Sequence, residues 1–106
     1  MTWSIEFLEE AEKDLQKLDH SSQIQVLKGI VKVSKKPLPI HEGGYGKPLG
    51  NKHGINLSNL LKIKLKSSGL RIIYSVRRNA QKMTIIIIGI RADNEVYKEA
   101  QKRISK

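Results

Sequence analysis

The side chains best suited to chemistry in this sequence are four cations and one tyrosine, all in its second half. Lys62 and Lys64 alternate with apolar residues, and Arg71 follows in a second alternating run. Arg91 ends a long apolar stretch, and Tyr97 lies six residues further on. No carboxylate neighbours the first three cations, and like charges that face each other weaken a hairpin. A bound anion would supply the missing partner, so these three cations form a candidate phosphate site, and Arg91 and Tyr97 are two further residues that bear on this interpretation.

Each of these residues also has a plainer interpretation. Lysines on a strand often do no more than solvate its exposed face. Arg91 could be an exposed strand end, and Tyr97 could be a wedge between a helix and the sheet. Position and charge therefore have to decide between a site and an ordinary surface.

The charge is distributed unevenly along the chain. The formal net charge is +10, and the segment from Lys62 onward holds twelve Lys or Arg against three Asp or Glu, an excess of +9. The segment up to Leu61 holds eight against seven. Such a skew is typical of proteins that bind polyanions, because each neutralised phosphate releases counterions. A surface that is basic only for solubility is the alternative.

Several kinds of chemistry are excluded or disfavoured by composition. The chain has no Cys, so disulfides, thiol nucleophiles and Cys-bound zinc are excluded. His20, His41 and His53 form no short-spaced pair and have no carboxylate set beside them for zinc or magnesium. We interpret them as solvated loop residues, with His41 or His53 swinging over a substrate as the alternative. We expect no metal and no small-molecule cofactor.

The start of the chain has no basic region followed by an apolar stretch, and the run Ile85–Ile88 is too short to span a bilayer. We expect a cytoplasmic protein with no membrane partner.

The elements that must position the candidate site follow from hydrophobic periodicity. Trp3, Ile5 and Phe7 alternate with polar residues, which predicts a short strand. An amphipathic helix should run from Leu8 to near Asp19. A second helix, capped by Ser21 or Ser22, should end at Lys35-Lys36-Pro37 with these apolar residues inward: Ile24, Leu27, Ile30, Val31 and, as a further candidate, Val33.

The segment from Pro37 to Asn59 holds all three prolines and five glycines, which predicts a long loop. It is not a P-loop, because Gly46-Lys47 is followed by Pro48 and not by the Ser or Thr and the helix that such a loop requires.

Two alternating runs joined by Ser67-Ser68-Gly69 predict a β-hairpin. A four-residue turn over Lys66–Gly69 would place Leu65 opposite Leu70, Lys64 opposite Arg71 and Ile63 opposite Ile72. A three-residue loop would instead put Arg71 on the apolar face, where burial of an unpaired guanidinium is costly. We therefore prefer the first register, with the cations together on one face.

The run from Met83 to Ile90 is apolar at both odd- and even-numbered positions, which predicts a strand covered on both faces. Asp93 or Asn94 can cap a short final helix with Val96, Ala100 and Ile104 inward. The order β-α-α-β-β-β-α predicts an α+β fold in a single domain, residues 1–106. In this fold a mostly antiparallel four-stranded sheet packs against an N-terminal helical hairpin and a short C-terminal helix.

The basic hairpin, residues 61–74, resembles the catalytic hairpin of RelE toxins in the RelE/ParE superfamily. Gly89-Ile90-Arg91, Glu95-Val96-Tyr97 and residues 100–103 resemble the closing strand and last helix of that family. The resemblance covers essentially the whole chain. There are two departures: Asp93 stands where the best-known relatives have a further cation, and the loop 37–59 is longer than theirs.

The resemblance implies the toxin of a toxin–antitoxin system, an endoribonuclease that cleaves mRNA in the ribosomal A site. Its implied partners are the ribosome, mRNA and a cognate acidic antitoxin protein. By position, the catalytic set of the family falls on Lys62, Lys64, Arg71, Arg91 and Tyr97.

Metal-free cleavage of RNA proceeds by attack of the 2′-hydroxyl on the adjacent phosphate. Lysine ordinarily keeps its proton at neutral pH, but neighbouring cations disfavour the charged form, so Lys62 or Lys64 can act as base. Arg71 and Arg91 suit phosphate contact better than acid catalysis. Tyr97 can orient the hydroxyl or stack on a base. The leaving-group acid stays open between a lysine, Tyr97 and a ribosomal group.

The competing interpretation is the ParE branch, whose members share the fold and inhibit DNA gyrase without catalysis. Fold alone does not separate the two branches. A gyrase binder has no need for the five-residue set, so we favour the nuclease.

Overall fold

The computed structural model describes residues 3–52, 55–65, 68–89 and 93–104, with side chains described for these residues except 51, 52, 55–59, 93 and 94. The elements, in chain order, are strand β1 (Ser4–Phe7), helices α1 (Glu9–Gln16) and α2 (His20–Ser34), the short 3₁₀ helix η1 (Ile40–Glu42), strands β2 (Lys47–Lys52), β3 (Ile55–Lys64), β4 (Arg71–Arg77) and β5 (Lys82–Gly89), and helix α3 (Asp93–Ile104). None of the helices in these parts of the chain is long and apolar enough to cross a membrane.

The strands form one five-stranded sheet in the order β1-β5-β4-β3-β2. β1 pairs with β5 in parallel, whereas β5, β4, β3 and β2 pair antiparallel with their neighbours. The α+β class is confirmed, but the expected four-stranded, mostly antiparallel sheet is wrong in strand number, and the sheet is mixed.

The fifth strand comes from the segment that the sequence predicts to be a loop. Residues 37–59 contain η1, all of β2 and the first part of β3. β2 was missed because Leu49 is its one large apolar residue, so no alternation is visible. It is an edge strand paired only with β3, a position in which Pro48 is tolerated.

The first helix ends at Gln16 instead of near Asp19. The side-chain amide of Gln23 donates hydrogen bonds to the carbonyls of Leu15, at 3.0 Å, and Leu18, at 3.1 Å. These bonds add to the 3.1 Å hydrogen bond that the Leu18 amide donates to the Leu15 carbonyl, and together they hold the turn between the two helices.

The second helix begins at His20, with Asp19 in extended conformation at the cap position, so the expected cap at Ser21 or Ser22 is wrong. A hydrogen bond with the Ser22 side chain lowers the pKa of Asp19. Asp19 is thus the N-cap residue of α2.

Only part of the apolar surface of α2 is buried. Of the residues predicted to point inward, Ile30 and Val33 lie in the core, whereas the others are exposed: Ile24 by 40%, Leu27 by 42% and Val31 by 53%. Val26, which the prediction did not include, is fully buried. Helix α3 shows the same effect, because Val96 and Ala100 are fully buried but Ile104 is 45% exposed. The predicted cap at Asp93 or Asn94 is also wrong, since α3 already begins at Asp93.

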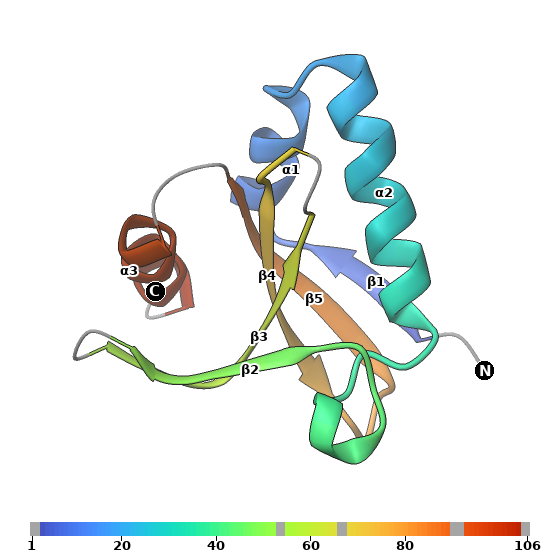
Figure 1. Ribbon diagram of the computed structural model, residues 1–106, viewed down its shortest axis with the longest axis vertical. Helices are drawn as coiled ribbons and strands as arrows, with labels where there is room; N and C mark the ends of the chain where they lie inside the picture. The colour runs from blue at the N-terminus through green and yellow to red at the C-terminus, as the bar shows by residue number, and fades with distance from the viewer. Residues whose placement is uncertain (1–2, 53–54, 66–67, 90–92, 105–106) are drawn as a thin grey trace.

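The sheet has a core on each face. α1 and α2 lie together on one side, and α3 covers part of the other (Figure 1). β5 is buried from Met83 to Ile88, as its apolar run predicts. The β4–β5 register shifts between Ile73 and Tyr74, which pair with Ile87 and Ile85. Ile86 is therefore the extra residue of a bulge, and both Ile86 and Ile87 pack on the α3 side.

The segment before β2 is held against the sheet by Tyr74. The buried Tyr74 hydroxyl donates a 2.8 Å hydrogen bond to the Pro37 carbonyl. A Cβ at Gly46 would collide with this hydroxyl, so glycine is required there. Burial raises the pKa of Tyr74 well above its ordinary value.

We predict that Tyr74→Phe lowers the free energy of unfolding by about 1–3 kcal/mol at neutral pH, because the Pro37 carbonyl loses its partner. The difference from the unmutated protein should narrow above about pH 10. There Tyr74 ionises in the unfolded state but stays protonated in the folded state. The free energy of unfolding of the unmutated protein therefore falls by about 1.4 kcal/mol per pH unit, while that of the phenylalanine variant does not.

Urea unfolding at several pH values measures both effects. Tyr45→Phe is the matched control, because Tyr45 is 51% exposed. A difference between the Tyr74 variant and the unmutated protein that stays constant to about pH 11 would contradict this account.

Candidate active site

The β3–β4 hairpin has the register that the sequence predicts. Lys64 pairs with Arg71 and Ile63 with Ile72. The Leu65 amide donates to the Leu70 carbonyl at 2.9 Å, and the Gly69 amide donates to the Leu65 carbonyl at 2.9 Å. Gly69 has φ 74°, a conformation that glycine adopts readily. The four-residue turn is therefore confirmed.

This register separates the cations from the apolar residues. Ile63 and Ile72 belong to the core beneath α1 and α2. Lys62 and Lys64, one position away on either side of Ile63, point to the opposite face, the face of α3. Lys64 is exposed, and Arg71, partly buried, donates from Nη1 to the Gly69 carbonyl at 3.3 Å. Lys62, Lys64 and Arg71 thus share one face.

Lys62 and Tyr97 join this face to helix α3. Lys62 Nζ donates to the Tyr97 hydroxyl at 3.1 Å and lies 5.7 Å from the centre of the tyrosine ring. Tyr97 as a whole is only 2% exposed, and it packs in the core beneath α3. Tyr97 is therefore a wedge between helix and sheet whose hydroxyl also meets a site cation. Stacking of its ring on an RNA base, one of the sequence-based alternatives, is not available in this arrangement.

Arg91 lies outside the described residues, as does the side chain of Asp93. The nearest described residue before Arg91 is Gly89, which pairs with Arg71. Of the five candidate residues, the structure brings Lys62, Lys64, Arg71 and Tyr97 together.

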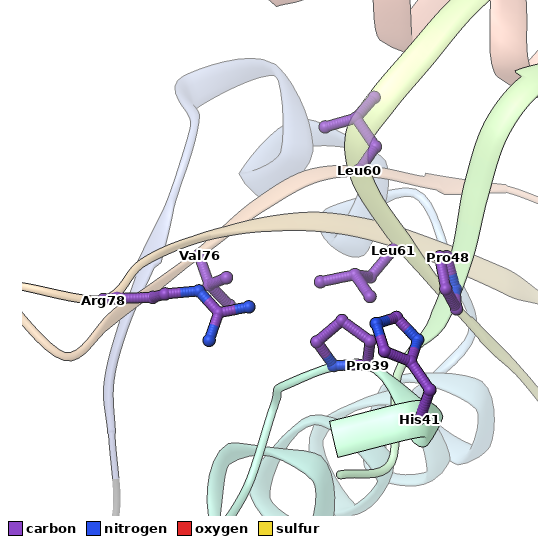
Figure 2. Close-up of a pocket in the computed structure, with 7 residues that line it drawn as sticks. All are labelled: Pro39, His41, Pro48, Leu60, Leu61, Val76 and Arg78. Atoms are coloured by element: carbon purple, nitrogen blue, oxygen red, sulfur yellow. The ribbon is translucent and has the colours of Figure 1, made fainter. Parts of the chain in front are cut away.

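The histidines do not join this cluster. His41 and Arg78 line a cavity of about 320 Å³ beside Pro39 and Pro48 (Figure 2). The cavity is also lined by Leu60 and Leu61, which directly precede Lys62 on β3. It thus reaches the residues next to Lys62, but its described lining includes none of Lys62, Lys64, Arg71 and Tyr97.

Arg78 donates two 2.6 Å hydrogen bonds to Glu42, which lower the pKa of that carboxyl. The cation at this cavity is therefore already paired. His20 is an exposed residue at the start of α2, and His53 lies outside the described residues. No group of three or more His, Asp or Glu gathers as metal ligands would anywhere in the described chain.

Sequence reasoning did not single out Asp14 or Arg103, which contact each other at the far end of α3. Arg103 Nη1 donates to Asp14 Oδ2 at 2.7 Å across 89 positions of sequence. A pair so distant in the chain has no local sequence pattern that could have revealed it.

Comparison with known proteins supplies the family. No family model matches the chain. The mRNA interferase toxin RelE of Escherichia coli K12 is 34% identical over 104 residues, which cover 98% of this chain and 99% of that protein. A putative RelE-like toxin protein of E. coli is 32% identical over the same share. The chain belongs to the RelE family of toxins.

Solved structures agree with this assignment. The structure of a mutant of E. coli RelE in the free state is 32% identical in sequence and superposes with a TM-score of 0.74. The match covers 98% of this chain and 99% of the RelE chain. The same toxin in complex with a peptide of the antitoxin RelB is 30% identical with a TM-score of 0.71, over 94% and 95% of the two chains.

We predict that Tyr97→Phe leaves the fold intact, whereas Tyr97→Ala lowers the free energy of unfolding by about 3–5 kcal/mol, because the ring fills the core and only the hydroxyl enters the site. Thermal unfolding of both variants checks this. Equal melting temperatures for the two variants would show that the ring does not support the core. The phenylalanine variant is therefore the suitable one for functional tests.

Proposed function

We propose that this protein is the toxin of a toxin–antitoxin pair and that it cleaves mRNA in the ribosomal A site. The observation that carries the proposal is the contact between Lys62 and Tyr97 beside the cross-strand pair of Lys64 and Arg71. Support also comes from relatives named mRNA interferases that align over nearly the whole chain.

The face is suited to a phosphate that gains negative charge. Three cations lie on it, and Lys62 has its hydrogen bond directed to a phenol and not to a carboxylate. The arginine guanidinium matches phosphate oxygens in a two-pronged contact. A preorganised set of such donors stabilises the charge that builds up on a pentacovalent phosphorus.

The cleavage step needs a proton acceptor, charge stabilisation and a proton donor. The 2′-hydroxyl loses its proton and attacks the adjacent phosphorus, and the P–O5′ bond breaks. The departing O5′ takes up a proton from a lysine, from Tyr97 or from a ribosomal group, so the products are a 2′,3′-cyclic phosphate and a 5′-hydroxyl. Lys62 is held by its hydrogen bond to the Tyr97 hydroxyl, whereas Lys64 is exposed beside Arg71, and we therefore assign Lys64 the role of base. Lys62, Arg71 and Arg91 stabilise the phosphorane, and Tyr97 orients the nucleophile.

The partner that restrains the toxin is an acidic antitoxin protein. The excess charge of +9 from Lys62 onward is complementary to such a chain, and charge complementarity speeds association. E. coli RelE, which is 28–30% identical to this chain in these structures, is known in complex with the antitoxin RelB.

We predict that Lys64→Ala lowers the cleavage rate by a factor on the order of 100 or more, with a change in unfolding free energy below about 0.5 kcal/mol. Lys17→Ala is the matched control, since it removes an exposed cation at the end of α1, on the other side of the sheet. Lys64→Arg should bind ribosomes and antitoxin but fail to cleave, because arginine does not readily give up its proton.

Cleavage is measured by mapping 5′ ends of mRNA in a purified translation mixture. Full activity in Lys64→Arg would make Lys64 a charge stabiliser and leave Lys62 as the base. Should Lys62, Lys64, Arg71 and Arg91 each tolerate alanine without loss of toxicity, the nuclease proposal fails and gyrase inhibition becomes the better explanation.

We predict that the upstream fragment carries a cyclic phosphate or a 3′-phosphate, because the 2′-hydroxyl is the nucleophile. Enzymatic end-labelling with and without phosphatase treatment of the fragment distinguishes these ends from a free 3′-hydroxyl. Magnesium stays at a concentration that keeps ribosomes intact. A 3′-hydroxyl on the upstream fragment would rule out this mechanism, since water activated elsewhere would then be the nucleophile.

A further inference from the structure

Arg103 is a densely hydrogen-bonded side chain of α3, although it lies far from the cationic face. Its side chain is 9% exposed and that of Asp14 is 16% exposed. Arg103 donates to both Asp14 oxygens, at 2.7 and 3.2 Å, to the Ile86 carbonyl at 2.8 Å and to Glu99 at 3.1 Å. One guanidinium thus ties α3 to α1 and to β5.

The Asp14–Arg103 pair occupies the edge of β5 that β1 leaves open. β1 ends at Phe7, opposite Ile85. Beyond that point, Asp14 Oδ2 accepts a 3.1 Å hydrogen bond from the Ile88 amide, and Arg103 donates to the Ile86 carbonyl. Two side chains therefore continue the pairing that a longer strand would supply, and they fix the last turn of α3 to that edge.

Arg103 lies on the helix where its contacts can determine the position of Tyr97. Val96, Ala100 and Arg103 follow the spacing of one helical face, and this face lies on β5. Tyr97 follows Val96 in the helix, so it lies beside this face, and its hydroxyl contacts Lys62 on β3. A roll of α3 by about 20° would move an atom at the helix surface, about 5–6 Å from the axis, by about 2 Å. Such a shift exceeds the slack in a 3.1 Å hydrogen bond.

We propose that the Asp14–Arg103 ion pair is a positioning device of the nuclease: it sets the roll of α3 and so holds the Tyr97 hydroxyl against Lys62. The inference rests on the proposed function, because it matters for cleavage only where Tyr97 takes part. Arg103 touches neither substrate nor reacting atoms. A misplacement of about 1 Å at a reacting group can cost on the order of 100-fold in rate.

The test is a double-mutant cycle between Arg103→Gln and Tyr97→Phe, measured as single-turnover cleavage of ribosome-bound mRNA. Arg103→Gln should lower the cleavage rate by about ten- to hundredfold with little change in the half-saturating toxin concentration. In the Tyr97→Phe background the same substitution should cost less than about threefold, because there is no hydroxyl left to misplace. Lys102→Gln is the matched control: it makes the same charge change at the neighbouring, exposed position and should leave the rate unchanged.

Circular dichroism and melting temperature show whether each variant is folded. If Arg103→Gln does not fold, Arg103→Lys and Asp14→Asn take its place in the cycle, since both keep the size and polarity of the pair. Equal losses with and without the Tyr97 hydroxyl would overturn the inference, because a purely structural role gives independent effects. Full activity in all folded Arg103 and Asp14 variants would overturn it as well. Full activity in Tyr97→Phe alone would instead overturn the proposed site, and the two failures are thus distinguishable.

Discussion

The backbone hydrogen bonds that close the β3–β4 hairpin decide which face of the sheet every side chain on these strands occupies. Leu65 and Leu70 are bonded across the turn, and Gly69 donates back to Leu65. A slip of one residue would exchange the two faces of one strand, carrying Lys62 and Lys64 into the core beneath α1 and α2. Burial of unpaired ammonium groups there would be costly. The same bonds therefore complete the apolar core and gather the cations on the opposite face.

Gathering the cations has its own cost, since like charges on neighbouring strands repel each other. The structure offsets part of it without neutralising the face. Lys62 lies near the Tyr97 ring and donates to its hydroxyl, so it gains cation–π and hydrogen-bond stabilisation while keeping its charge. A carboxylate in place of Tyr97 would pair more strongly with the ammonium group, but it would lose the packing of the ring in the core and would compete with phosphate. A phenol is thus the partner compatible with an anion-binding face.

The sequence predicts those features that depend on local hydrophobic periodicity and on the free-energy cost of burying a charge. The register of Lys64 with Arg71 and the two buried faces of β5 could both be predicted in this way. β2 could not, because one apolar residue, Leu49, gives no period, and the pairing of β2 depends on β3. The buried stripe of α2 was misplaced in the prediction, which included the exposed Leu27 and omitted the buried Val26. Periodicity marks which residues are apolar and not which of them the sheet covers. The site was predictable in composition but not in its support: the burial of the Tyr97 ring depends on how α3 docks, and the contact of Arg103 with Asp14 spans 89 positions, so it exists only once the chain has folded.

An open cationic face and a fixed tyrosine hydroxyl make opposing demands on helix α3. A helix of twelve residues is marginal by itself and needs packing to hold it. A broad apolar contact would hold it firmly, but it would also cover the sheet where a polyanion must approach. Here the apolar contact is confined to one stripe, Val96, Tyr97 and Ala100, and Ile104 stays exposed. The remaining constraint comes from Arg103, whose hydrogen bonds are directional and need little area. Anchoring by a few directional bonds at one end of the helix thus leaves the other end free to present Tyr97 beside an uncovered row of cations.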